Sequence, residues 1–546
     1  MPFVLFCQNG SYNNTMKNAV YTNATIVTAL SVAERSLGFL YRIVLSRLIG
    51  AEGLGLYQVA LSIFSLFMTV GTGGIPITVS RMIAKSKAEN SAKGERSAVS
   101  AGICLCLLLT VPVCLIFGLF RVRPSFLFAD KRSYDVFRIL LVGLSVTCVY
   151  AVFRGSFWGN KRFLLPSVIE VAEETVMVIV GVLLLQNVAT PLDGAKKAAW
   201  AVVISYLFSF VVSTLSFFFC GGKLCAPKKS LKPLFNATMP ITSVRASSSL
   251  VNSAIAVLLP AMLVRAGIEN GEALRLFGIV SGMAMPILFV PSTLIGALSL
   301  VLVPELSEDF YRKNYERLHK NIARGIHFAV LLSCILIPFF YAVGEDLARL
   351  AFSNAMAGEI VVKGCVILLP MSLTMITTGM LNSLGFEKQT FLFYFIGAAA
   401  MLLCVLFLPP FFGVYAYVIG LGASFFLNAV CNLTFLHKKC QIFEKRRGHV
   451  RVQIFLPAFL SVLPLCLLGQ FFDSVFKRFC GQLTVVVCVS TLLALSTLLV
   501  YTLTGAIPLV AFLKKLGVKK FRIKKRTRTS KTPFSTPKKR PKPRFP

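Results

Sequence analysis

Long apolar runs separated by short polar segments recur along almost the whole chain. Fourteen runs exceed the roughly 20 residues that a helix needs to cross a bilayer core of about 30 Å. Because so many apolar helices leave almost no polar face for water, the pattern predicts an all-α, polytopic membrane protein. The expected transmembrane helices cover residues 24–48, 54–80, 98–120, 133–157, 163–187, 197–220, 234–264, 275–303, 322–343, 356–383, 389–410, 412–436, 453–473 and 482–507.

Glycine and proline interrupt several of these runs. The first two runs are joined by a short Gly-rich turn, Gly50–Gly53. Membrane helices tolerate glycine and proline in general, but the same residues also allow helices to bend or unwind around a transport cavity. Both interpretations remain open for the segment Gly71–Pro76 and for Pro240, Pro260, Pro286, Pro291, Pro304 and Pro370.

The first run carries charges where lipid-like side chains are expected. A charge in a membrane helix costs at least about 2.5–3.5 kcal/mol on insertion scales and therefore indicates a functional interior. Arg35, Gly38 and Arg42 lie at positions i, i+3 and i+7, which share one helix face. We therefore expect a narrow cationic face that lines a substrate site. The alternatives are arginines that reach a membrane interface or pair with Glu34 or Glu170.

A third arginine and an amide lie deep in the run 234–264. Arg245 is about eleven residues into this run, which is roughly 16 Å at 1.5 Å per residue. Asn252 follows seven residues later on the same face. We expect both side chains to line the same interior as Arg35 and Arg42.

Three acids occupy one face of the run 163–187. Glu170, Glu173 and Glu174 lie at i, i+3 and i+4, about 13–20 Å from the basic end of that run. Three carboxylates at this depth cannot all be ionised without partners. They form an H+ or Na+ coupling site, or pair with arginines of a neighbouring helix, or lie in shallow, water-filled surroundings.

Composition agrees with the membrane class and argues against an enzyme. Hydrophobic residues make up 56% of the chain and charged residues only 14%, against about 25% charged in average soluble chains. The 15 cysteines lie mostly inside apolar runs, with no CxxC motif, so we interpret them as small apolar residues rather than metal ligands. No nucleotide loop, nucleophile elbow or zinc-protease motif is present. We expect no enzymatic activity, no cofactor and no metal.

The distribution of basic residues predicts the orientation in the cell membrane. The net charge is +35, and the last 33 residues contain 15 Lys or Arg and no acid. With a cytoplasmic N-terminus, the inside loops before this tail carry 24 basic residues and the outside loops 11, as the positive-inside rule requires. Both termini are therefore expected in the cytoplasm. The tail should be disordered and should contact anionic lipids rather than nucleic acid.

Several motifs resemble, in matching order, the stage V sporulation protein B family. This family comprises polysaccharide-export-type members of the multidrug/oligosaccharidyl-lipid/polysaccharide (MOP) exporter superfamily. The resemblance extends from about Met16 to about residue 507. It is carried by ERSLGFLYRIVLSRLIGAEGLGLYQ (34–58), GIPITVSRMIA (74–84), FRGSFWGN (153–160), PSVIE (166–170), LVPELS (302–307) and GMLNSLG (379–385).

The resemblance implies two pseudo-symmetric bundles of six helices around a central cavity, followed by two C-terminal helices. The regions implied are an N-terminal extension (1–20), two bundles (21–230 and 231–440), two further helices (441–510) and a basic tail (511–546).

The resemblance also implies a function. The lipid II flippase branch moves undecaprenyl-pyrophosphate-linked peptidoglycan precursor by alternating access, with arginines of the first helix lining the cavity. Arg35 falls on one such position, in the pattern R-x-x-G-F, whereas Tyr41 stands at the second position with Arg42 beside it. The expected partner is thus a lipid-linked oligosaccharide. A cation-coupled multidrug antiporter of the same superfamily and a non-transporting membrane scaffold are the alternatives.

Overall fold

The protein folds into helices throughout its described parts. The computed structural model describes residues 16–120, 128, 130–227, 230–440, 459–478 and 481–503. Within these ranges no β-strand occurs, which confirms the predicted all-α class. The helices are α2 (Met16–Thr72), α3 (Ile75–Ala88), α4 (Ala92–Val113), η1 (Cys114–Leu119), α5 (Lys131–Gly159), α6 (Leu164–Leu184), α7 (Pro191–Phe219), α8 (Leu231–Arg265), α9 (Asn270–Phe277), η2 (Gly278–Ala284), α10 (Met285–Phe289), α11 (Ser292–Tyr311), α12 (Tyr315–Phe352), α13 (Ala355–Gly364), η3 (Cys365–Ile367), α14 (Leu368–Ser383), α15 (Glu387–Phe407), α16 (Pro409–Phe412), α17 (Tyr415–Cys440), α19 (Val462–Phe476) and α20 (Gln482–Leu503).

The helices are long and apolar enough for a multi-pass membrane protein. Eleven segments of the described chain meet both criteria for crossing a membrane. The first of them, Ile26–Ala88, has 63 residues and covers two of the runs expected from the sequence. Helix α6 carries three glutamates, and α19 has only 15 residues. The exact number of fourteen spans stays a prediction.

Helix α2 bends sharply at Gly50. This residue has φ 70° and ψ 179°, and the chain is helical again from Ala51 onward. A Cβ atom at Gly50 would meet nothing within 4 Å, so the conformation rather than a lack of space favours glycine here. The turn between the first two runs is therefore shorter than the Gly50–Gly53 segment that the sequence predicts.

Glycine and proline elsewhere have unequal effects. Helix α2 ends at Thr72 and α3 begins at Ile75, with Pro76 in its first turn, so the Gly71–Pro76 segment does break the helix. Helix α8, in contrast, continues through Pro240 and Pro260. Of the two interpretations left open by the sequence, the continuous helix favours general tolerance of proline at these two positions. Nearby hydroxyl groups and neighbouring helices can satisfy backbone groups that proline frees.

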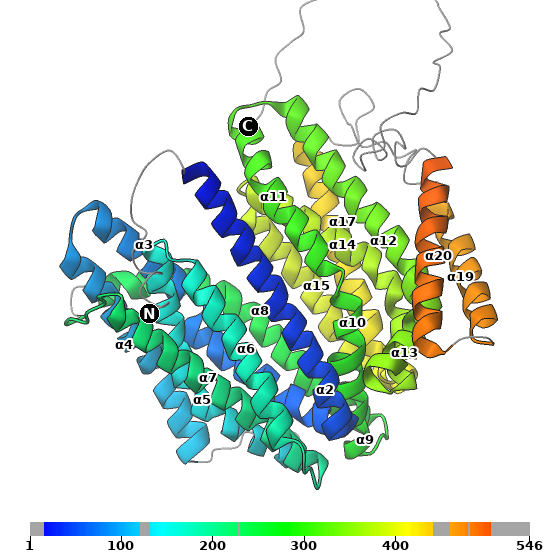
Figure 1. Ribbon diagram of the computed structural model, residues 1–546, viewed down its shortest axis with the longest axis horizontal. Coiled ribbons are helices and arrows are strands. Elements are labelled where there is room, and N and C mark those ends of the chain that lie inside the picture. Colours follow the sequence, from blue (N-terminus) through cyan, green and yellow to red (C-terminus); the bar gives the residue numbers. More distant parts are fainter. Residues whose placement is uncertain are drawn as a thin grey trace, which may run out of the picture.

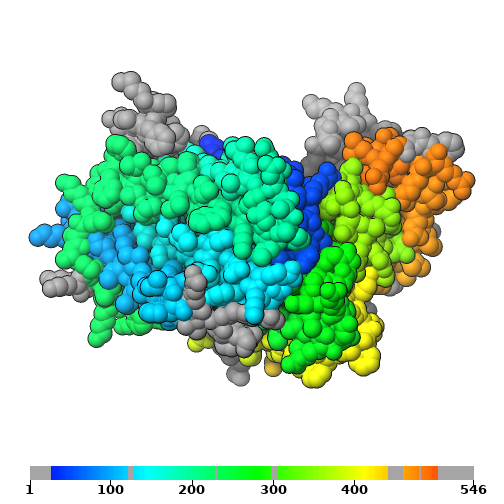
Figure 2. Space-filling view, turned by 90° about the horizontal axis from the view of Figure 1, so that it is seen from below, coloured from blue at the N-terminus to red at the C-terminus, as the bar shows by residue number. Residues whose placement is uncertain are grey.

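The helices pack as two groups joined mainly by α2 and α8 (Figure 1). In the N-terminal group, α5 contacts α2, α3, α4 and α7, and α6 packs on α7. In the C-terminal group, α12 contacts α13, α14, α19 and α20, and α17 packs on α14 and α15. Helix α2 contacts α5, α6 and α7 on one side and α8, α9 and η2 on the other. Figure 2 shows α2, in dark blue, reaching the surface between the two groups.

The regional boundaries expected at residues 230 and 440 stay predictions, because α8 contacts α2, α4 and α15 alike. The N-terminal residues 1–15 and the basic tail 511–546 lie outside the described residues.

The second half of α2 and the segment α9–η2 approach each other through glycines. A Cβ atom at Gly55 would lie 2.0 Å from the carbonyl oxygen of Leu274, and one at Gly278 would lie 2.1 Å from that of Ala51. Real Cβ atoms do not come so close, so only glycine permits this contact. The neighbouring Leu54 is fully buried. The two helix groups are thus tightly packed beyond the bend, on the side of α9.

Candidate functional site

The charged faces of α2 and α6 lie against each other. A Cβ atom at Gly38 would lie 3.0 Å from Oε1 of Glu174, and one at Gly181 would lie 2.5 Å from the ring of Tyr41. Small residues on both helices therefore let the acidic face of α6 approach α2. The narrow face that the sequence predicts around Gly38 is the surface that receives Glu174.

Arg35 and Arg42 remain exposed on the first half of α2. Neither guanidinium makes an ion pair or a side-chain hydrogen bond with any described residue. Arg42 interacts electrostatically with Glu174, and Arg35 with Glu34, but neither pair reaches contact. A structural pair between Arg35 and either Glu34 or Glu170, one of the alternatives left open by the sequence, is absent from the described residues. No described residue therefore occupies either cation as an ion-pair partner.

Glu170 pairs with an arginine that sequence reasoning placed elsewhere. Arg154 Nη1 donates a hydrogen bond to Oε1 of Glu170 across 2.8 Å. The guanidinium carbon of Arg154 also lies 5.2 Å from the ring centre of Trp158 and 5.9 Å from that of Tyr150. The total of 24 basic residues in the inside loops includes Arg154, but this residue lies inside α5. Its place in the FRGSFWGN motif, seven residues before the basic loop residues Lys161 and Arg162, could have indicated that Arg154 belongs to the helix.

The three glutamates of α6 face three different helices. Glu170 meets α5 through Arg154, and Glu174 meets α2 beside Gly38. Glu173 lies near Ser209 of α7, and its Oε2 atom is buried without a hydrogen-bond partner among the described residues. No group of three or more His, Cys, Asp or Glu residues in the described chain is arranged to hold a metal ion. The shared face expected from the sequence therefore does not converge on one ion.

Arg245 and Asn252 lie exposed on α8. The adjacent face of α8 meets the second half of α2, where Ser253 Oγ donates a hydrogen bond to the Ser62 carbonyl oxygen across 2.6 Å. Among the described residues, no hydrogen bond or ion pair joins Arg245 or Asn252 to Arg35. The structure thus places two of the predicted site residues on α2 and two on α8, without bringing the pairs into direct contact.

Polar contacts that the sequence did not single out join the two helix groups near the bend of α2. Arg132, at the start of α5, lies 2.7 Å from Glu52 and 3.0 Å from Asp130. Asn270 of α9 donates a hydrogen bond to Asp130 across 3.3 Å. Arg47 of α2 donates hydrogen bonds to the last carbonyl groups of α12. We refer to Glu52, Asp130, Arg132 and Asn270 as the α9-side cluster.

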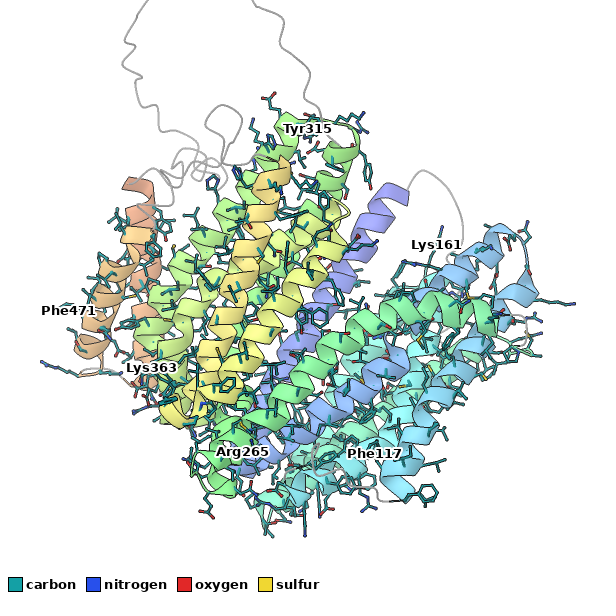
Figure 3. All side chains as sticks on the ribbon, turned by 180° about the vertical axis from the view of Figure 1, so that it is seen from behind. Phe117, Lys161, Arg265, Tyr315, Lys363 and Phe471 are labelled. Atoms are coloured by element: carbon teal, nitrogen blue, oxygen red, sulfur yellow. The ribbon has the colours of Figure 1, made fainter. Side chains whose placement is uncertain are left out.

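These contacts all lie toward one end of the molecule. Figure 3 shows Arg265, which precedes α9, at the end opposite to Lys161 and Tyr315. A cavity of about 350 Å³ between α2, α5, α8 and α9 is lined by Asp130, Arg265 and Asn270, among mostly apolar residues. This cavity does not include Arg35, Arg42 or Arg245. The contacts hold the two helix groups together on the α9 side, while the exposed arginines of α2 precede the bend.

Comparison with protein families gives one extended match. The model of a family described as "Polysaccharide biosynthesis protein" matches residues 20–310. The match covers more than half of the chain.

Three curated relatives come from Bacillus subtilis (strain 168). Stage V sporulation protein B is 24% identical over 362 residues, which cover 62% of this chain and 68% of the relative. Lipid II flippase MurJ is 23% identical, over 56% of this chain and 61% of the relative. Sporulation protein YkvU is 22% identical, over 53% of this chain and 66% of the relative. The alignments thus span about two thirds of the length of these relatives.

Solved structures share the fold at low sequence identity. The lipid II flippase MurJ in an inward closed conformation aligns with a TM-score of 0.65 and 14% identity, covering 89% of this chain and 99% of that one. An inward-facing multidrug resistance MATE family transporter of the MOP superfamily aligns with a TM-score of 0.61 and 15% identity, covering 76% and 98%. At this identity the likeness concerns the fold alone, which this chain shares with both transporters.

Proposed function

Because the chain belongs to the polysaccharide biosynthesis protein family, we propose that it is a flippase for a lipid-linked glycan precursor. The favoured cargo is an undecaprenyl-pyrophosphate-linked precursor of the lipid II type, moved across the cell membrane by alternating access for cell-wall or spore-cortex assembly. The relatives are named as a flippase and sporulation proteins, not as enzymes. One observation carries the proposal: Arg35 and Arg42 are exposed cations, without an ion-pair partner among the described residues, on the helix that lies between the two helix groups.

Each part of the proposed cargo has a matching chemistry. Arginine presents several donors in a fixed planar fork, which suits the oxygens of a pyrophosphate. Arg35 and Arg42 are assigned this role, because no described carboxylate pairs with them. Arg245 and Asn252 supply exposed hydrogen-bonding groups for the glycan on α8. The apolar helices supply surface for the polyprenyl chain.

The coupling role falls to two of the three glutamates. Glu170 already has Arg154 as a partner, so it is assigned a structural role. Glu173 has a buried oxygen without a partner, and Glu174 lies beside α2. A carboxyl group in such surroundings suits a proton that binds and leaves during transport. We favour H+ over Na+, because the three carboxylates do not converge.

A cation-coupled multidrug antiporter is the second candidate. The MATE family likeness and the buried Glu173 favour it. The two candidates differ in cargo, since a drug exporter has no need of unpaired arginines for a pyrophosphate.

The test is transport by the purified full-length protein in liposomes loaded with fluorescent lipid II. Arg35→Ala and Arg42→Ala should each lower the rate by roughly tenfold or more, as removal of one charge-assisted contact costs about 1.5–3 kcal/mol. Arg35→Lys should recover only part of the rate, because a point charge cannot replace the planar fork. Arg478→Ala removes an exposed arginine from the end of α19 and is the matched control. Equal rates for all four variants would refute the clamp.

One further variant separates ligand binding from a structural pair. If Arg35 only balances Glu34, the neutral double variant Arg35→Gln/Glu34→Gln should recover the activity that Arg35→Gln loses, because the stranded charge is gone. A double variant that stays inactive at normal protein levels supports contact with the cargo. Transport of drugs but not lipid II by the unaltered protein would favour the antiporter.

A further inference from the structure

A second group of cations, which have no ion-pair partner among the described residues, lines a cavity away from the proposed cargo site. The cavity has a volume of about 270 Å³ and lies where α4 begins and where α5 and α7 end. Its basic residues are Arg96, Arg162 and Lys223. Figure 3 shows Lys161, the neighbour of Arg162, at the end of the molecule opposite to Arg265. The charge distribution of the sequence predicts that this end faces the cytoplasm.

The three cations have no acidic partner in the described chain. Arg96, Arg162 and Lys223 make no ion pair and no side-chain hydrogen bond with any described residue. Among the described residues that line the cavity, Glu95 is the one acid, so three positive charges there face one negative charge. Other arginines at helix ends do have partners, as Arg275 has in Glu272. A concave surface with unbalanced positive charge is a place for an anion.

The surrounding backbone adds to this preference. Ala92, Glu95 and Arg96 belong to the first turns of α4, a helix of 22 residues whose N-terminal end carries a partial positive charge. Backbone groups already cap the ends of α5 and α7: the amide of Arg162 bonds the Phe157 carbonyl, and Gly222 bonds Phe217. The cationic side chains are therefore not needed to satisfy these carbonyl groups.

Apolar side chains beside the cavity indicate what kind of anion it meets. Phe219 is 82% exposed and Phe218 is 50% exposed, next to Cys220 and Gly221 of the cavity wall. Leu224, beside Lys223, is also exposed. Exposed apolar side chains at the end of a membrane helix favour contact with lipid over contact with water. Basic pockets between helices on the cytoplasmic side are places where acidic headgroups bind.

We propose that Arg96, Arg162 and Lys223 bind a phosphate group, held in place as the headgroup of an anionic phospholipid. None of these residues belongs to α2, α6 or α8, so the site is separate from the arginines assigned to the cargo and does not rest on the proposed function. None of the three residues belongs to the basic tail 511–546. The inference adds a structural lipid site to the N-terminal helix group.

The test measures binding to the full-length protein in a neutral detergent by isothermal titration. The probes are dioctanoyl phosphatidylglycerol, dioctanoyl phosphatidylcholine and inorganic phosphate. The variant Arg96→Ala/Arg162→Ala/Lys223→Ala removes the cations of the cavity. Its matched control, Lys87→Ala/Lys232→Ala/Lys388→Ala, removes the same charge from exposed residues outside it. A third variant, Arg96→Lys/Arg162→Lys, keeps the charge, and gel filtration reports whether each variant is folded.

We expect phosphatidylglycerol to bind the unaltered protein and the control at least tenfold more tightly than the alanine variant, with the lysine variant close to the unaltered protein. Phosphatidylcholine should bind weakly to all of them. Equal phosphatidylglycerol affinity for the alanine variant and the control would overturn the site. Inorganic phosphate that binds as tightly as phosphatidylglycerol, and is lost only in the alanine variant, would support the phosphate chemistry but overturn the lipid as its source.

Discussion

Arg154 of α5 holds Glu170 of α6 through a hydrogen bond of 2.8 Å, while one tryptophan ring and one tyrosine ring flank its guanidinium. The pair connects two helices that follow each other in the chain but make few other contacts. Because Glu170 is paired, Glu173 and Glu174 are the better candidates among the three glutamates of α6 for exchanging a proton. Glu170 is therefore a positioning residue for α6, and this assignment can be tested directly.

Breaking the Arg154–Glu170 pair should destabilise the protein. Arg154→Gln or Glu170→Gln leaves one charge without its partner, and we expect each to lower the free energy of unfolding by roughly 1–3 kcal/mol, below the cost in a fully buried pair. The double variant should recover part of the loss. The measurement is thermal unfolding of the detergent-purified protein.

A matched control exists for this experiment. Lys85 and Glu89 form an ion pair with side chains 75% and 58% exposed, and such surface pairs contribute about 0–1 kcal/mol. Lys85→Gln should leave the unfolding temperature nearly unchanged. If Lys85→Gln and Arg154→Gln have equal effects, the pair does not position α6.

Adding one methyl group at Gly55 should disturb the contact between the two helix groups. The new Cβ would lie 2.0 Å from the Leu274 carbonyl oxygen, which is a backbone atom and cannot rotate away. We expect Gly55→Ala to cost about 1–3 kcal/mol of unfolding free energy, as overpacked cores do. Gly118→Ala is the control, because a Cβ there meets nothing within 4 Å. A Gly55→Ala variant as stable as Gly118→Ala would contradict the close approach.

The α9-side cluster should keep its neighbouring cavity closed to reagents. Arg132→Ala leaves Glu52 and Asp130 without their shared partner, so the helices around the cavity should separate more often. A loss of about 1 kcal/mol raises the open population roughly fivefold. The readout is the alkylation rate of a cysteine at Ala256, which lines the cavity and is 3% exposed.

The alkylation experiment uses a protein without native cysteines. Arg275→Ala breaks the exposed pair with Glu272, outside the cluster, and should leave the rate unchanged. An Arg132→Ala variant with an unchanged rate would show that the cluster does not hold the helices together.

The loop charges predict the orientation of the protein in the membrane, and cysteine labelling tests this prediction. Single cysteines at Lys131 and Lys232, both exposed, should react differently with a membrane-impermeant maleimide in intact cells. We expect reaction at Lys131 without permeabilisation and at Lys232 only after it. The reverse pattern would invert the predicted topology.

The sequence predicted where the helices form, but it did not predict which of them continue through a proline. Apolar length predicts the helical segments because a bilayer sets their minimum span. Proline alone did not predict breaks: Pro240 and Pro260 lie in a continuous α8, whereas the Gly71–Pro76 segment ends a helix. The difference lies in the glycines beside Pro76. Glycine leaves the backbone free to depart from the helix, and proline removes an amide donor, so both effects act at the same place.

The candidate site was predictable only as faces of single helices. The spacing of Glu170, Glu173 and Glu174 shows that they share one face. The spacing does not show that this face of α6 contacts three helices, α5, α7 and α2. In the structure Arg154 lies beside Glu170, Ser209 beside Glu173 and Gly38 beside Glu174. Arg154 was missed for the same reason, since partners across helices depend on tertiary packing. Whether Arg245 and Arg35 can share a ligand also depends on how α8 packs against α2.

The bend at Gly50 divides α2 into parts with unequal freedom to change during evolution. Beyond it, Leu54 and Ile63 are fully enclosed and Gly55 admits no larger residue, so nearly every substitution there carries a penalty. Before it, Tyr41 and Leu45 are buried, but Leu40 and Arg42 face outward, so replacing either of these two disturbs little packing. A single helix can therefore acquire a new cargo preference at one end while its other end preserves the architecture. Diversification among homologous chains should accumulate on the N-terminal side of this glycine.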